Sequence, residues 1–122
     1  MTSRATRLQP AVEQARRRSA DALSRFAVQQ QLLMKAEHQL SELHRYREEY
    51  AHHGDTMSSV SAMLNRQSFI QRIDLAIAQQ TAEVERLQRQ LEKVRDQWKQ
   101  SHARERALDS VVTQHLESER RC

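Results

Sequence analysis

The chain has 122 residues, a formal net charge of +4 and a hydrophobic fraction of 38%. This length suits one domain, and the low apolar content excludes a globule with a thick core. With one glycine and one proline, the chain can reverse direction only once or twice. A long two-helix coiled coil needs only a narrow apolar seam, so this composition favours one over a disordered chain if the apolar residues are periodic.

We expect neither a signal peptide nor a membrane-spanning helix from the sequence. Met1–Pro10 has no apolar core of the signal-peptide type, and no apolar run reaches the ~18 residues that a spanning helix needs. The single cysteine, Cys122, cannot form an internal disulfide and suits a reducing compartment. We therefore expect a cytosolic protein.

The first 30 residues are basic, with only Glu13 and Asp21 as acidic residues. Consecutive residues of a helix point about 100° apart, so Arg16, Arg17 and Arg18 do not form one stripe. A solvated surface is the favoured interpretation, ahead of a phosphate-binding site and an acidic protein partner. The arginines of this end are Arg4, Arg7, Arg16, Arg17, Arg18 and Arg25.

A first helix is predicted from about residue 9 to 52. Pro10 marks its start, because a proline is tolerated in a first helical turn. Residues spaced alternately by three and four follow, and ten of these thirteen are apolar, which favours a helix over disorder. The series is Leu8, Val12, Ala15, Ser19, Ala22, Phe26, Gln29, Leu33, Ala36, Leu40, Leu43, Arg47 and Tyr50.

A turn is predicted at about residues 53–59. Gly54 is the only glycine, and glycine ends helices well because it adopts a left-handed conformation without steric cost. Asp55, Thr56, Ser58 and Ser59 follow, all good residue types for an N-cap. We expect the second helix to begin between Thr56 and Gln67.

A second helix is predicted from about residue 60 to 118. Ten of fourteen residues in its series are apolar, and a strict alternation of three and four is typical of a coiled-coil seam. The chain is thus predicted to be all-α: one domain, a long antiparallel two-helix coiled-coil hairpin. The series is Ile70, Ile73, Ile77, Gln80, Val84, Leu87, Leu91, Val94, Trp98, Ser101, Glu105, Leu108, Val112 and His115.

Motifs for catalysis or metal binding are not found. The sequence has no glycine-rich phosphate loop, no Cys/His metal spacing and no Ser-His-Asp pattern. Glu49 and His52 have the spacing used in di-iron bundles, but such sites need a second motif and two more carboxylates. We expect no enzyme activity, no cofactor, no metal and no small-molecule ligand.

Aromatic residues gather near the predicted turn. Tyr46 and Tyr50 are four residues apart and share a helix face, and antiparallel pairing brings Phe69 close to them. Leu43 and Ile73 complete this cluster. Core packing and partner binding are equally compatible with it, because aromatic residues are common in both settings. Trp98 lies within the seam series, where packing is the default interpretation.

Two segments of the chain resemble the flagellar export protein family FliJ. The first is Ala36–Tyr50, with the pattern L-x-x-L-x-x-Y-x-x-x-Y, and the second is Asn65–Ile77, with the pattern F-[IL]-x-x-[LI]-x-x-A-I. The resemblance extends over about residues 8–118. It implies an antiparallel two-helix coiled coil, similar to the central stalk of the rotary F-type ATPase.

The resemblance also implies a function. Members of the family act in the flagellar type III export apparatus, at the cytoplasmic side of the inner membrane near the basal body. They promote assembly and turnover of the hexameric export ATPase FliI, contact the export gate protein FlhA and handle export chaperones. They have no catalytic centre, and we expect no nucleic-acid partner.

The resemblance further implies which residues contact the gate. Family members have a histidine near position 80, where this chain has Gln80. The ATPase-facing end would be the paired termini, for which the charge of Arg16, Arg17, Arg18 and Arg25 is our only guide. The residues matched to the gate contact are Gln39, Leu43, Tyr46, Tyr50, Phe69, Ile73 and Ala76.

Three other functions compete with this interpretation, and one of them, an enzyme accessory or metal carrier, is disfavoured because metal-ligand spacing is absent. The equivalent stalk protein of a virulence type III secretion system would show the same sequence physics. A basic coiled-coil nucleic-acid-binding protein would show steeply salt-dependent DNA binding, although acidic residues are interspersed along the second helix.

Overall fold

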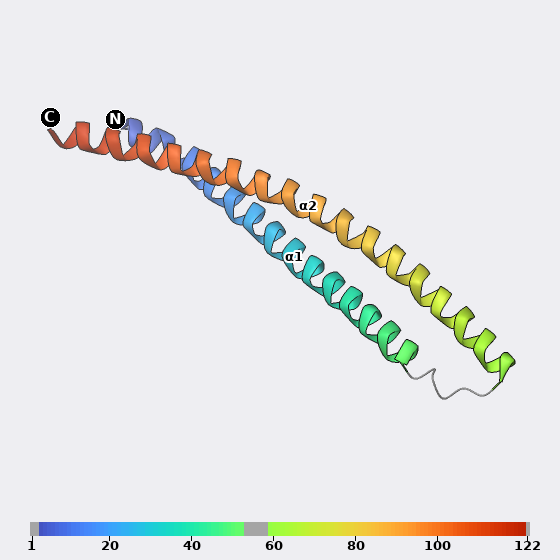
Figure 1. Cartoon of the computed structure of the whole chain (residues 1–122). Coiled ribbons are helices and arrows are strands. Elements are labelled where there is room, and N and C mark those ends of the chain that lie inside the picture. Colours follow the sequence, from blue (N-terminus) through green and yellow to red (C-terminus); the bar gives the residue numbers. More distant parts are fainter. Residues whose placement is uncertain (1–2, 53–58, 122) are drawn as a thin grey trace. The chain divides into compact units, whose positions relative to one another are not determined.

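The computed structural model describes residues 3–52 and 59–121. It is all-α, with two long helices, α1 (Arg4–His52) and α2 (Val60–Arg121), packed against each other as an antiparallel hairpin (Figure 1). The all-α hairpin predicted from the sequence is confirmed. Contacts divide it into a terminal unit, which pairs residues up to Gln29 with residues from Gln90 onward, and a central unit, Gln30–Arg89.

Helix α1 begins at Arg4, five residues before the predicted start at about residue 9. Ser3 caps it, because the Ser3 hydroxyl accepts a hydrogen bond from the Thr6 backbone N–H at 3.0 Å. Pro10 therefore lies inside the helix and not at its start. Since proline has no N–H, the Thr6 carbonyl receives no bond from residue 10. The prediction placed the start at the proline and overlooked the cap that precedes it.

Helix α2 begins at Val60, within the predicted interval. Ser59 is its N-cap: the hydroxyl accepts from the Ala62 N–H, and the backbone carbonyl accepts from the Met63 N–H, both at 3.1 Å. The helix continues to Arg121, three residues beyond the predicted end. The predicted glycine cap at Gly54 and the rest of 53–58 lie outside the described residues.

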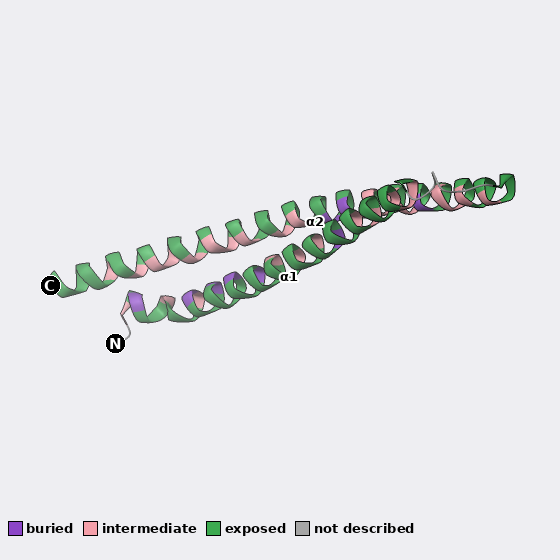
Figure 2. Ribbon diagram, turned by 60° about the horizontal axis from the view of Figure 1, so that its bottom comes forward, coloured by how far each residue is buried: buried purple, intermediate pink, exposed green. Residues whose placement is uncertain are grey.

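The two predicted series form the contact between the helices. Every member of both is buried or half-buried, and the buried residues follow the side of each helix that faces the other (Figure 2). In the central unit the core consists of Ala36, Val84 and Leu87, with Leu33 and Leu40 packed against it. In the terminal unit the buried residues are small, for example Val12, Ala15 and Ala22.

Polar residues occupy a few seam positions. Ser19 is only 5% exposed in the terminal unit, and Gln80 is half-buried in the central unit. Polar side chains at such positions reduce stability but can fix the register of two helices. Over the described residues, neither helix contains a stretch long and apolar enough to cross a membrane.

Candidate functional site: a groove between the helices

The seam can be numbered by heptads, with a and d as the buried positions. On α1, residues 40 and 47 are a positions and 43 and 50 are d positions; on α2, residues 70 and 77 are a and 73 and 80 are d. Two contacts show which sides meet across the hairpin. In the central unit Tyr46 meets Phe69, both at g, and in the terminal unit Arg16 meets Asp109, both at e. Within each unit, one side of the helix pair is therefore lined by d and g positions and the other by a and e positions.

All seven residues matched to the gate contact lie on the d/g side of the central unit. Leu43, Tyr50 and Ile73 occupy d positions, while the other four occupy g positions. We call this surface, which follows the line where the two helices of the central unit meet, the aromatic groove and define it by Gln39, Leu43, Tyr46, Tyr50, Phe69, Ile73 and Ala76.

Phe69 contacts both tyrosines of the aromatic groove. Its ring centroid lies 4.5 Å from that of Tyr50 and 6.2 Å from that of Tyr46, at tilted angles of 41° and 54°. Aromatic pairs prefer such tilted arrangements. Tyr46 remains 53% exposed, whereas Ile73 is 6% exposed. Ile73 therefore belongs to the core beneath the groove, and Tyr46 presents its ring to the surface.

Arg72 also belongs to this surface, and the sequence interpretation missed it. Its guanidinium lies over the Phe69 ring, 5.7 Å from the centroid, which is a cation–π distance. Arg72 follows Phe69 by three residues, and residues at that spacing share a helix face. The spacing of three residues between Phe69 and Arg72 could therefore have indicated from the sequence that Arg72 borders this surface.

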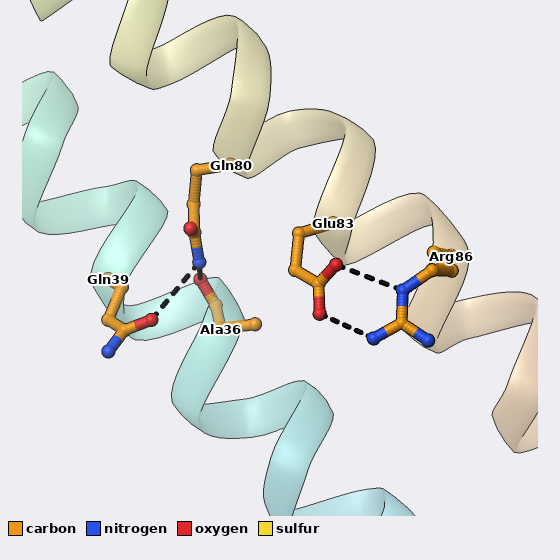
Figure 3. Close-up of polar contacts among 5 residues, drawn as sticks. All are labelled: Ala36, Gln39, Gln80, Glu83 and Arg86. Atoms are coloured by element: carbon orange, nitrogen blue, oxygen red, sulfur yellow. Dashed lines mark hydrogen bonds and ion pairs between the residues drawn. The ribbon is translucent and has the colours of Figure 1, made fainter.

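Gln80 closes the groove at the end away from Tyr50. Its side-chain N–H groups donate to the Ala36 backbone carbonyl at 3.0 Å and to the Gln39 side-chain oxygen at 3.2 Å (Figure 3). At this position, where the family resemblance led us to expect a histidine, Gln80 is thus bonded to Gln39, a predicted contact residue. On the next turn of α2, Glu83 and Arg86 pair with each other at 2.6 Å.

The opposite side of the central unit is closed by an ion pair. Arg47 on α1 donates to both carboxylate oxygens of Asp74 on α2, at 2.5 and 3.4 Å. This bond lowers the pKa of the Asp74 carboxyl and raises the pKa of the Arg47 guanidinium. The a/e side of the central unit thus presents a charged pair, whereas the d/g side presents aromatic rings.

The four arginines of the predicted basic cluster do not form one surface. Arg16 donates to Asp109 of α2 at 3.2 Å, and Arg17 occupies the next position around the helix, away from the seam. Arg18 and Arg25 are seven residues apart and share g positions on one side. A shallow groove there is lined by Arg18 and Arg104, with Ala15, Gln100 and Ser101. Arg104 was not predicted, because it is distant from this cluster in sequence.

Within residues 3–52 and 59–121, no three His, Cys, Asp or Glu side chains are grouped as a metal ion would require. The chemistry that the aromatic groove offers is apolar contact, with hydrogen-bonding and charged groups at its edges.

Comparison with known proteins identifies a family. The family model described as "Flagellar FliJ protein" matches residues 3–121, nearly the whole chain. No curated protein matches the chain, and no solved structure does. Because the match includes both helices and the aromatic groove, the chain belongs to the flagellar FliJ protein family.

Proposed function

We propose that this chain is a non-catalytic stalk and adaptor of the flagellar type III export apparatus. Membership of the FliJ family makes it a flagellar export-associated coiled-coil protein. The finer roles belong to the proposal: the chain contacts the export gate protein FlhA, promotes assembly and turnover of the hexameric export ATPase FliI, and handles export chaperones. It works at the cytoplasmic side of the inner membrane, at the flagellar basal body.

The gate contact is assigned to the aromatic groove. The observation that carries this assignment is that seven residues, chosen by resemblance from two distant segments, occupy one side of the hairpin. Tyr46 is more than half exposed beside Phe69, and exposed aromatic residues are favoured anchors of protein interfaces. Gln39 and Gln80 provide a polar edge.

The ATPase contact is assigned to the terminal unit. Arg18, Arg25 and Arg104 project from one side of it, and a basic surface attracts an acidic partner at long range. Two helices inside a ring of six subunits cannot match the six-fold symmetry of the ring. Different subunits therefore meet different side chains of the stalk, which favours different conformations around the ring.

Hydrolysis of ATP by the cognate export ATPase, measured with increasing amounts of this chain, tests the stalk role. Stimulation that saturates near one chain per ATPase hexamer is the expected result. If both proteins are folded and the rate does not change at any ratio, the stalk mechanism is wrong. The chain would then be an adaptor alone, and the gate interaction would still be testable by itself.

A further inference from the structure

The aromatic groove is bordered by charges of opposite sign on its two helices. We propose that its occupant is an amphipathic helix of the partner, which places an acidic side chain against Arg72. This inference rests on the proposed gate contact and specifies the partner segment that makes it. It also adds Arg72 to the binding residues.

The helical structure of the aromatic groove favours a helix as the occupant. Both sides of the groove are helices, whose backbone groups are hydrogen-bonded internally. An extended peptide therefore finds no sheet edge here with which it could pair. The groove residues follow a spacing of three and four on both helices, and a third helix can pack its own rows of side chains against rows with this spacing. Binding of an amphipathic helix in such a groove is a common recognition mode.

The length of the groove limits the segment that it holds. The Gln39–Gln80 bridge marks one end, and the contact of Tyr50 with Phe69 marks the other. From Gln39 to Tyr50 the helix rises about 17 Å at ~1.5 Å per residue. About three turns of a partner helix fit this distance, so its apolar stripe needs three or four anchors.

The border on α1 is acidic. Glu42 and Glu49 occupy c positions next to the groove, and Arg45 forms an ion pair with each of them. The hydrogen bond from Arg45 lowers the pKa of Glu42. Two carboxylates against one guanidinium leave this border with a net negative charge at neutral pH.

The border on α2 is basic. Arg72 is the charged c-position residue beside Phe69, and it makes no ion pair within residues 3–52 and 59–121. Its guanidinium lies over the Phe69 ring, and because it makes no ion pair within the described residues, its N–H groups are available to a carboxylate. Arginine commonly combines stacking on an aromatic ring with pairing to a carboxylate.

These borders define the charge pattern of the partner helix. A helix lying over Tyr46 and Phe69 meets Arg72 on one flank and Glu49 on the other. An acidic residue on the first flank and a basic residue on the second would be complementary. This arrangement fixes the direction in which the helix lies, because reversing it would oppose like charges.

The test is binding of the cytosolic domain of the cognate gate protein, measured by calorimetry at low and at physiological salt. The variants are Arg72→Gln, Arg72→Glu and Arg72→Lys, with Arg89→Gln as matched control. Arg89 is an exposed arginine on the outer side of the same helix. Circular dichroism checks that each variant keeps its helicity.

We expect Arg72→Gln to weaken binding about tenfold, with a smaller salt dependence, and Arg72→Glu to weaken it further. Arg72→Lys should weaken it less than Arg72→Gln, since the charge remains. Arg89→Gln should bind like the unmodified chain. Hydrogen exchange of the gate domain should show one protected helix that carries an acidic residue beside its apolar stripe.

Four outcomes would overturn the inference. If Tyr46→Ala abolishes binding and Arg72→Gln does not alter it, the gate contact stands and the role of Arg72 is wrong. Equal losses for Arg72→Gln and Arg89→Gln would show general charge attraction instead of a site. Protection confined to a strand or loop of the gate domain would refute the helical occupant. A gate domain that does not bind the unmodified chain refutes the gate contact and the inference together.

Discussion

Gln80 lies at a d position, which the heptad pattern otherwise fills with apolar side chains in this part of α2. The sequence placed it in the seam, but periodicity could not show its partners. The structure gives it two acceptors on α1, the Ala36 carbonyl and the Gln39 side chain. A polar residue so bonded fixes the register of two helices at a cost in stability.

Replacing Gln80 with leucine should therefore stabilise the hairpin. We expect the free energy of unfolding to rise by about 1 kcal/mol, because a half-buried amide is exchanged for apolar contact. Urea unfolding followed by circular dichroism measures it. Gln79→Leu, at the adjacent exposed position, is the control and should have little effect. Destabilisation by Gln80→Leu would show that the hydrogen bonds outweigh the cost of burial.

The Arg47–Asp74 pair should make the stability of the hairpin decrease at acidic pH. Its hydrogen bond lowers the pKa of Asp74 in the folded chain, so the folded state binds fewer protons than the unfolded state. The resulting stability is complete above the unfolded pKa of about 4 and is lost as the pH falls through the lower folded value.

We therefore expect the urea midpoint of the unmodified chain to fall as the pH is lowered from 5 towards 3. Asp74→Asn should lower the midpoint at pH 7 and reduce this change, since its side chain does not titrate. Glu85→Gln is the matched control, because Glu85 is an exposed residue of the same helix and makes no ion pair within residues 3–52 and 59–121. If the urea midpoint of Asp74→Asn falls with pH as steeply as that of the unmodified chain, the Arg47–Asp74 bridge does not contribute to stability in solution.

At the scale of the helices, the long apolar series were the most predictable feature. Every residue of both series is buried or half-buried, because a spacing of three and four is itself the geometry of a helix face. The start of α1 was less predictable. Proline was taken as the first-turn residue, whereas a capping serine begins the helix at Arg4 and Pro10 is tolerated within it.

The Ser59 cap gives a prediction for α2. Ser59→Ala removes the oxygen that accepts from the Ala62 N–H and should cost about 1 kcal/mol of stability. Hydrogen exchange should show faster opening of the first turn of α2. Ser61→Ala, at an exposed position within that turn, is the control and should not destabilise the chain. Equal exchange rates in both variants would argue against the cap.

The groove was only partly predictable from the sequence. The resemblance supplied its seven residues, and antiparallel pairing brought Phe69 near the tyrosines. The border of the groove could not be predicted, because periodicity does not determine side-chain positions. These positions place Arg72 over Phe69 and form the Gln39–Gln80 bond. The basic cluster was grouped by adjacency in sequence, although neighbours on a helix point in different directions.

At the scale of the whole molecule, the two proposed partners bind different units. In a triple variant, Gln replaces Arg18, Arg25 and Arg104. We expect this variant to stimulate the export ATPase several-fold less than the unmodified chain, because a basic surface raises the rate of association with an acidic partner. Arg17→Gln, on the outer side of α1, is the control. Gate binding by the triple variant should be unchanged, since the aromatic groove lies in the central unit. Full stimulation by the triple variant would refute the assignment.

The most direct test of the central claim is binding of the gate domain to Tyr46→Ala. Tyr46 is 53% exposed in the groove, and Leu75 is 60% exposed on the outer side of α2, so Leu75→Ala is a matched loss of exposed apolar surface. We predict that Tyr46→Ala weakens binding by about 2 kcal/mol, roughly thirtyfold, with unchanged helicity, while Leu75→Ala binds normally. Equal binding by the two variants, or a loss of helicity in Tyr46→Ala that explains its weaker binding, would contradict the claim that the aromatic groove is the interface.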